Sequence, residues 1–342
     1  MSKFLLYSDL HIREDTLQTC ETALSQIGEL AVKHEVDYII NGGDTFNTRG
    51  LLPTSCLDVL YKHYKKWSNN GSKQIILVGN HDQEDRKGEV HPMKVFESFD
   101  GWHVVDRPQI IEGIENTIFC PYMHKNDVQN YLAAAKKKHG NWRSWDAFVH
   151  WGICGAKRND SNTDTDGVLL DWLENFRNVF SGHYHFRNTI QNVHYIGSPY
   201  QQNFGEMNQE KGIVIYDNDK NKKDFYEIKN TPKHYEVSIE WNEKGKRIVK
   251  GKIDEIGEKD HTRFKIFGDS EQCSKISANN QDIVNCHSVK IERFVRERHI
   301  SRLEITSDEV LSPNSLVEKY IKFVDTTLDK KQLMKVGMEI LS

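Results

Sequence analysis

A repeated alternation in the first two-thirds of the chain constrains the fold most. Short apolar runs, each long enough for a buried strand, alternate with segments whose apolar residues have helical spacing. The strand-like runs are 4–8, 38–41, 74–78, 117–122, 147–151, 178–182, 193–197 and 212–217, and the helix-like segments are 16–34 and 54–67. Strands that alternate with helices predict a layered α/β fold, and the shorter connections between the later strands predict a second, mixed sheet.

The rest of the chain has a different pattern. From about residue 230 polar and apolar residues alternate, as in 263–268 and 288–294, which predicts a small α+β domain. Ser312 and Pro313 then supply an N-cap and a first-turn proline for a terminal helical pair. Its apolar residues are Leu316, Tyr320, Val324, Leu328, Leu333, Val336, Ile340 and Leu341. This pair either packs on its own protein or docks a partner.

Composition excludes several classes of protein. Hydrophobic residues make up 37% and charged residues 28% of the 342 positions, as in ordinary globular proteins. No apolar run approaches the roughly 18 residues that a membrane span requires, and the chain enters a strand at once, so we expect a cytoplasmic protein without membrane contact. The six cysteines form no CxxC pair, which favours reduced thiols. A net charge of −4 argues against a broad basic surface for nucleic acid.

Five polar motifs follow apolar runs, where the strands of such a fold end. They are SDLH (8–11), GGDTFN (42–47), GNHD (79–82), FVHWG (148–152) and SGHYH (181–185). Each motif alone is more often a cap, a turn or a hydrogen-bonded polar segment. Together, their carboxylate, amide and imidazole groups would be poorly solvated and mutually repulsive at one sheet edge unless cations were bound. Oxygen and nitrogen donors without thiolate fit manganese, iron or zinc better than calcium or an iron–sulfur cluster.

These five motifs, in this order, resemble the signature of the calcineurin-like metallophosphoesterases. The segment YIGSPYQQNFGE (195–206) is similar to a Gly-Ser-Pro segment of the SbcD-type DNA-repair nucleases, which include phage recombination nuclease subunits. The resemblance implies a four-layer α/β fold with two mixed sheets flanked by helices over residues 1–228. It also implies a small α+β capping and DNA-binding domain over 229–308, and a helical segment over 309–342 that docks an ATPase.

The resemblance also implies a two-metal site. The ligands would be Asp9, His11 and His185 for one metal, Asn80, His150 and His183 for the other, and Asp44 between them. Two divalent ions can clamp a phosphodiester and activate a water molecule. Manganese is the expected metal, with magnesium, iron(II) and zinc as alternatives.

Further roles fall on residues beside these ligands. His81 would protonate the leaving oxygen or stabilise the transition state, and Asp82 would orient it. Many relatives carry a histidine three residues after the bridging aspartate, where this chain has Asn47. An amide can bind phosphate but cannot carry a proton. The strength of the exonuclease activity is therefore in question. Other candidates for phosphate contact, each with a plain surface charge as the alternative, are Arg49, Lys157 and Arg158.

The resemblance implies a DNA nuclease, with 3′-to-5′ exonuclease activity on duplex ends and endonuclease activity on single strands. It also implies an SMC-like ABC-type ATPase (SbcC-like) as partner, a homodimer within a heterotetramer, and the host cytoplasm for a phage-encoded protein. The sequence has no GxxxxGK[ST], so ATP would be bound by another polypeptide. That partner and two bound cations would offset the acidic net charge. The alternatives are a phosphatase or nucleotide phosphodiesterase acting on small molecules or phosphoproteins, and a non-catalytic scaffold.

Overall fold

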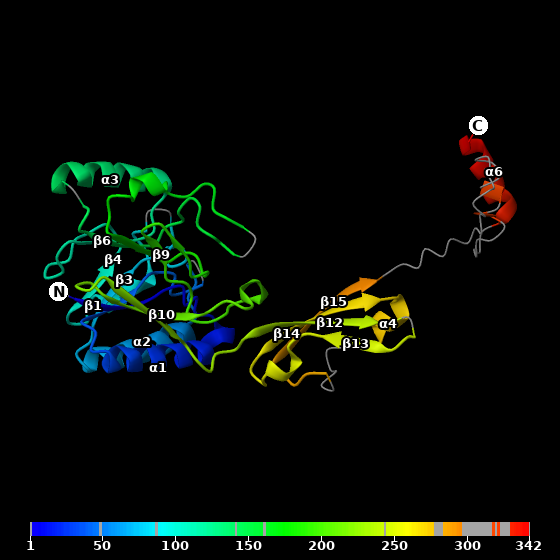
Figure 1. Cartoon of the computed structure of the whole chain (residues 1–342), viewed down its shortest axis with the longest axis horizontal. Helices are drawn as coiled ribbons and strands as arrows, with labels where there is room; N and C mark the ends of the chain where they lie inside the picture. Colours follow the sequence, from blue (N-terminus) through cyan, green and yellow to red (C-terminus); the bar gives the residue numbers. More distant parts are fainter. Residues whose placement is uncertain are drawn as a thin grey trace. The chain divides into compact units, whose positions relative to one another are not determined.

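The computed structural model describes most of the chain (Figure 1). The described residues are 2–47, 50–85, 88–140, 142–159, 162–242, 244–276, 283–295, 317, 318, 320, 321 and 329–341. They divide into two compact units, one drawn from 1–237, 251–263 and 281–290 and the other from 238–250, 264–280 and 291–342. The expected domain limits at 228 and 308 stay predictions. Expected residues that lie outside the described ones are Arg49, Ser312, Pro313, Leu316, Val324 and Leu328.

The first unit contains a six-stranded sheet in the order β11-β10-β1-β2-β3-β4. Its strands are β1 (Lys3–Tyr7), β2 (Tyr38–Asn41), β3 (Lys73–Leu77), β4 (Trp102–Val105), β10 (Gly212–Asp217) and β11 (Lys222–Glu227). The first four are parallel, and β10 and β11 run antiparallel at one edge. Helices α1 (Leu17–Lys33) and α2 (Thr54–Asn69) provide the crossover connections that parallel neighbours require.

A second sheet in the same unit has the order β5-β6-β7-β9-β8. Its strands are β5 (Thr117–Cys120), β6 (Asp146–Val149), β7 (Asn178–Ser181), β8 (Thr189–Ile190) and β9 (Val193–Tyr195). Only β8 is antiparallel to its neighbour. Helix α3 (Lys125–His139) packs on this sheet through Val128, Leu132 and Ala135.

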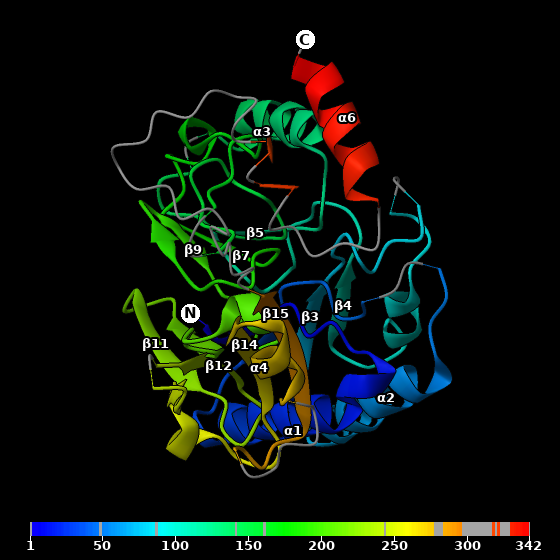
Figure 2. The same ribbon diagram turned by 90° about the vertical axis from the view of Figure 1, so that its right-hand side faces the viewer.

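The two sheets and their helices form four layers. In both ribbon views α3 lies on one side of the sheets, and α1 and α2 lie on the other (Figures 1 and 2). Alternate residues of β1 face opposite ways: Leu5 packs toward α1 and α2, whereas Phe4 packs between the sheets, 5.3 Å from the ring of Phe148. The predicted α/β fold with two mixed sheets flanked by helices is confirmed.

Downstream of β11 lies a four-stranded sheet in the order β13-β12-β14-β15. Its strands are β12 (His234–Trp241), β13 (Arg247–Lys250), β14 (His261–Gly268) and β15 (Ser288–Val295), with the helices α4 (Ser270–Ser274) and α6 (Lys330–Leu341) later in the chain. Short 3-10 turns are η1 (Glu14–Thr16), η2 (Pro92–Phe96), η3 (Leu170–Trp172), η4 (Phe204–Glu206) and η5 (Ile253–Glu255). None of the described helices is both long and apolar enough to cross a membrane.

Candidate metal centre

The five polar motifs meet at one edge of the two sheets. β1, β2 and β3 in the first sheet, and β6 and β7 in the second, are parallel strands that each end just before or within a motif. The carboxyl ends of parallel strands face the same edge, and loops there carry the functional groups of α/β proteins. The topology therefore brings together side chains that are far apart in sequence.

Four expected ligands have backbone conformations that non-glycine residues rarely adopt. The φ angles are 56° at Asp9, 44° at His11, 51° at Asp44 and 83° at His183. Such residues cost about 1–3 kcal/mol each and persist only where the surrounding structure holds them. Close backbone packing supplies that restraint, because a Cβ at Gly79 would lie 2.2 Å from the Asp44 amide nitrogen.

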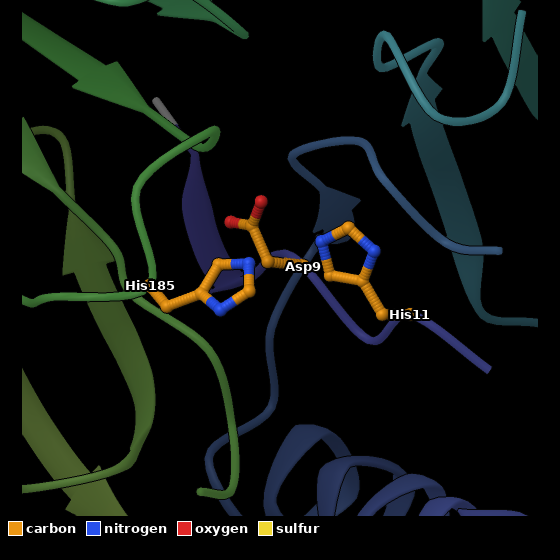
Figure 3. A group of neighbouring side chains, drawn as sticks. All are labelled: Asp9, His11 and His185. Carbon is orange, nitrogen blue, oxygen red and sulfur yellow. The ribbon is translucent and has the colours of Figure 1, made fainter. Parts of the chain in front are cut away.

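The side chains form three overlapping groups of potential ligands. These are Asp9, His11 and His185; Asp44, His150 and His183; and His11, Asp44 and His81, each with ligand atoms within 4.8 Å of one another. Figure 3 shows Asp9 and His11 on the loop after β1 and His185 on a separate loop. Asp44 belongs to two groups and joins them. Asn80 adjoins the second group, with its Oδ1 2.8 Å from Nδ1 of His183.

Several buried polar atoms in these groups have no hydrogen-bond partner. They are Oδ2 of Asp9, both ring nitrogens of His11, and Nε2 of His150. Leaving a buried polar atom unsatisfied costs about 1–3 kcal/mol, and divalent cations would satisfy the Asp9 oxygen, the His150 nitrogen and one nitrogen of His11. The mixed oxygen and nitrogen donors fit such an ion.

Burial and the Asp44 carboxylate act in opposite directions on the pKa values of these imidazoles. Burial lowers the pKa of His11 and of His183 to about 3, so both rings are neutral and have a lone pair available. Burial alone would lower the pKa of His150 too, but the neighbouring Asp44 carboxylate raises it to about 9. His150 Nδ1 donates to the Gly42 carbonyl at 2.6 Å, and its Nε2 lies 3.3 Å from the Asp44 carboxylate.

His81 lies beside the ligands, and its ring is not held by Asp82 as the sequence suggested. The His81 amide donates to Asp44 at 2.8 Å, its ring lies 4.8 Å from that of His11, and its Nδ1 is 3.4 Å from the Asn47 carbonyl oxygen. The Asp82 carboxylate instead accepts three hydrogen bonds of 3.0 Å, from the backbone amides of Thr45, Phe46 and Gly79. Asp82 therefore joins the loop after β2 to the loop after β3.

A hollow of about 410 Å³ opens beside the metal ligands. It is lined by Arg158, Asn159, His183, Tyr184, His185, Asn203, Gly205, Glu206 and Gln209. Arg158 stands at its edge with a half-exposed side chain and pairs with buried Asp164 at 3.0 Å. Lys157 is exposed next to it, with its ammonium 5.9 Å from the centre of the Phe186 ring. Of the two expected cations of this loop, Arg158 lines the hollow.

Comparison with known proteins identifies the family. The model of the family described as calcineurin-like phosphoesterase matches residues 2–187, which is more than half of the chain. The protein belongs to the calcineurin-like phosphoesterase family. The predicted resemblance is thereby confirmed: the protein is a phosphoesterase of a fold that uses divalent metals.

Similar proteins include "Exonuclease subunit 1" of Enterobacteria phage T4. This phosphoesterase is 22% identical to it over 327 residues, which cover 93% of this chain and 90% of the relative. It is 28% identical to "DNA double-strand break repair protein Mre11" of Saccharolobus solfataricus over 148 residues, 40% of this chain and 39% of the relative. A solved dimetal phosphatase from Danio rerio is 9% identical, with a TM-score of 0.40 over 63% of this chain and 91% of the other.

Two buried charges next to the metal ligands of this phosphoesterase were not predicted from the sequence. Glu206 accepts a hydrogen bond from His185 Nδ1 at 2.8 Å, and Lys211 lies 2.7 Å from the other Glu206 oxygen. Burial alone would raise the pKa of Glu206, but the hydrogen bond from His185 and the Lys211 charge lower it to about 2. The available signal was the Gly-Ser-Pro segment that ends at Glu206, which suggested a family but no chemical role.

Proposed function

We propose that this phosphoesterase is a nuclease that hydrolyses phosphodiester bonds of DNA with two divalent metal ions, manganese first among them. The observation that carries the proposal is the convergence of the motif side chains into ligand groups that share Asp44. Support for DNA as the substrate comes from the two relatives whose names describe an exonuclease subunit and a DNA double-strand break repair protein.

The expected ligands divide between two metal positions. The first position consists of Asp9, His11 and His185, the second of Asn80, His150 and His183, and Asp44 serves both. When bound, two divalent ions lower the pKa of an attacking water and neutralise the charge of the phosphate. Asn80 contributes a neutral oxygen, which keeps the site accessible to an anionic substrate.

His81 is the proposed proton donor. A carbonyl oxygen only accepts hydrogen bonds, so the contact with Asn47 places a proton on Nδ1 of His81. When the ring carries a second proton, on Nε2, that proton is the one transferred to the leaving oxygen, and the ring is left neutral with its proton on Nδ1. Asn47 positions His81 through its backbone, and its amide side chain is left for the phosphate.

The hollow beside the ligands gives the scissile strand a place to bind. Arg158 presents a guanidinium at the edge of this hollow. The buried Asp164 carboxylate accepts a hydrogen bond from Nη2 of Arg158 and so restrains the guanidinium. A guanidinium fixed in this way suits bidentate contact with a phosphate. Lys157 adds a second, exposed positive charge on the same loop.

We further propose that the protein works as a homodimer with an SMC-like ABC-type ATPase. A partner of this kind would supply the ATP binding for which the sequence has no motif, and the wider grip on DNA that a net charge of −4 does not provide. The cleavage expected is 3′-to-5′ on duplex ends and endonucleolytic on single strands.

The test is digestion of an end-labelled DNA duplex by the purified protein, with Mn²⁺ or Mg²⁺ and with or without the ATPase and ATP. We expect Mn²⁺-dependent shortening that His81→Ala reduces by about 10²-fold or more, the range for losing a general acid. His103→Ala, which removes a partly buried histidine of β4, is the matched control. Rapid hydrolysis of a small aryl phosphodiester without DNA cleavage under any condition would reject the nuclease in favour of a small-molecule enzyme.

A further inference from the structure

The segment 198–211, between β9 and β10, supports the loops that carry the first metal position. Gln202 Nε2 donates to the Asp9 carbonyl at 2.6 Å, and the Tyr200 hydroxyl donates to the Leu10 carbonyl. Lys211 Nζ donates to the His185 carbonyl at 2.7 Å. The segment thus contacts both loops that supply Asp9, His11 and His185.

Glu206 is the centre of this support. Its carboxylate pairs with Lys211, and the two side chains are only 7% and 5% exposed. The backbone amide of Gln202 donates to Oε2 of Glu206 at 3.1 Å, and Asn203 Nδ2 donates to Oε1 at 3.0 Å. A buried charge pair with additional donors is rigid, because each group loses its compensation if the other moves.

This carboxylate fixes the tautomer of His185. An ionised carboxylate only accepts hydrogen bonds, so His185 carries its proton on Nδ1, 2.8 Å from Glu206. Nε2 is then left as the ligand atom of the group formed with Asp9 and His11. A carboxylate behind a ligating imidazole orients the ring and raises its basicity, and its loss costs about 10–100-fold in metal affinity.

The second metal position has a different support. His150 Nδ1 donates to the backbone carbonyl of Gly42, and His183 Nδ1 contacts Asn80. In the part of the chain that the structure describes, no hydrogen bond joins segment 198–211 to Asn80, His150 or His183. A change at Glu206 therefore acts on one position and spares the other.

We propose that Glu206, held by Lys211, is a positioning residue that sets the metal occupancy of the Asp9, His11 and His185 position independently of the other position. The inference rests on the proposed two-metal site. It goes beyond that site by assigning a different supporting residue to each of its two halves.

The experiment is Mn²⁺ titration of the metal-free, full-length protein by calorimetry, with electron paramagnetic resonance to detect coupled manganese pairs. The wild type is expected to bind two ions per chain and to show the coupled signal. Glu206→Gln is expected to keep one ion at wild-type affinity, weaken the other by about 10–100-fold, and lose the coupled signal at low Mn²⁺. DNA cleavage by this variant is expected to recover as Mn²⁺ is raised, with an unchanged KM for DNA.

Two further variants separate positioning from folding. Glu206→Gln combined with Lys211→Met leaves no unpaired buried charge, and it is expected to fold and still lose affinity at one position. Glu210→Gln, which removes an exposed carboxylate paired with Arg187, is the matched control and is expected to bind both ions normally.

Two results would overturn the proposal: wild-type affinity for both ions in the folded double variant, or equal weakening of both. Because ion binding is measured without substrate, it also separates this inference from the proposed function. A protein that showed the expected split in affinity but cut no DNA would reject the nuclease and retain the role of Glu206.

Discussion

The two halves of the metal centre differ in what holds their histidines. His150 is anchored by the backbone carbonyl of Gly42, on the loop after β2, which itself carries the shared ligand Asp44. His185 is anchored by the side chain of Glu206, which lies 21 residues further along the chain. A backbone anchor is unaffected by most substitutions, whereas a side-chain anchor is lost with a single change. A single substitution can therefore remove the support of His185 while the backbone support of His150 remains.

Asp44→Asn tests the residue that both halves share, and we expect the largest effect here. Asp44 belongs to two ligand groups, and an amide offers the ions no negative charge. Both Mn²⁺ sites should weaken together in calorimetry, and cleavage should fall by roughly 10³-fold or more, as for a central member of a catalytic unit. Asp15→Asn, at an exposed carboxylate, is the control. One ion bound at wild-type affinity would show that Asp44 serves a single position.

Gly43→Ala tests the backbone anchor itself. Gly43 has a φ of 103°, and a Cβ there would lie 2.5 Å from Nδ1 of His150. We expect the free energy of unfolding to fall by about 2 kcal/mol and Mn²⁺ affinity to drop at the second position first, the reverse of Glu206→Gln.

A matched variant isolates the contact with His150 from backbone strain. Gly50 also has a positive φ, of 82°, but its nearest atom to an added Cβ is 3.8 Å away. Gly50→Ala should therefore cost stability without changing either Mn²⁺ affinity. If Gly43→Ala weakened the Asp9, His11 and His185 position first, the two anchors would not be independent.

The smallest effect is expected at His194, which separates acid effects on the fold from acid effects at the metal positions. Burial in the second sheet, helped by the Lys223 charge and opposed by the Asp146 carboxylate, lowers its pKa to about 4. The unfolded chain binds this proton more tightly, so stability is complete above about pH 6.5 and falls as the pH drops toward 4. The full pKa shift corresponds to a loss of about 3 kcal/mol in the free energy of unfolding. Solvent screening at the partly exposed ring reduces this loss to about 1 kcal/mol.

Urea unfolding of metal-free protein at pH 7 and pH 5 measures that contribution. His194→Gln keeps a polar group between Thr189 and Asn178 but does not titrate. The wild type should lose about 0.5 kcal/mol more than the variant between the two pH values, because the full contribution is lost only below about pH 4. Equal losses of unfolding free energy in the wild type and the variant would show that groups other than His194 cause the acid sensitivity.

Sequence reasoning found most of the first unit, for reasons that particular elements show. The expected strands at 38–41 and 212–217 match β2 and β10, because each is a continuous apolar run bounded by polar residues. Helix α3 was not predicted. Among its side chains that the structure describes, the buried ones are Val128, Leu132 and Ala135, which form a narrow stripe. The helix ends in a run of lysines, so its amphipathic pattern is weak. The edge strand β11, which begins with three consecutive charged residues and has no fully buried position, was missed for a similar reason.

The site shows the same limit. Asp82 is next to His81 in sequence, and adjacency suggested that one orients the other. Only the folded chain brings the backbone amides of Thr45 and Phe46 to the Asp82 carboxylate, which accepts a hydrogen bond from each.

The sequence by itself determined the layered fold and the set of groups that could bind metal, because hydrophobic periodicity and the chemistry of donor atoms are local properties. Only the tertiary structure decided which partner fixes each ligand. The contacts between His185 and Glu206, and between His150 and Gly42, join residues 21 and 108 positions apart. Distances across such separations are set by how the sheets pack and not by the spacing of residues along the chain.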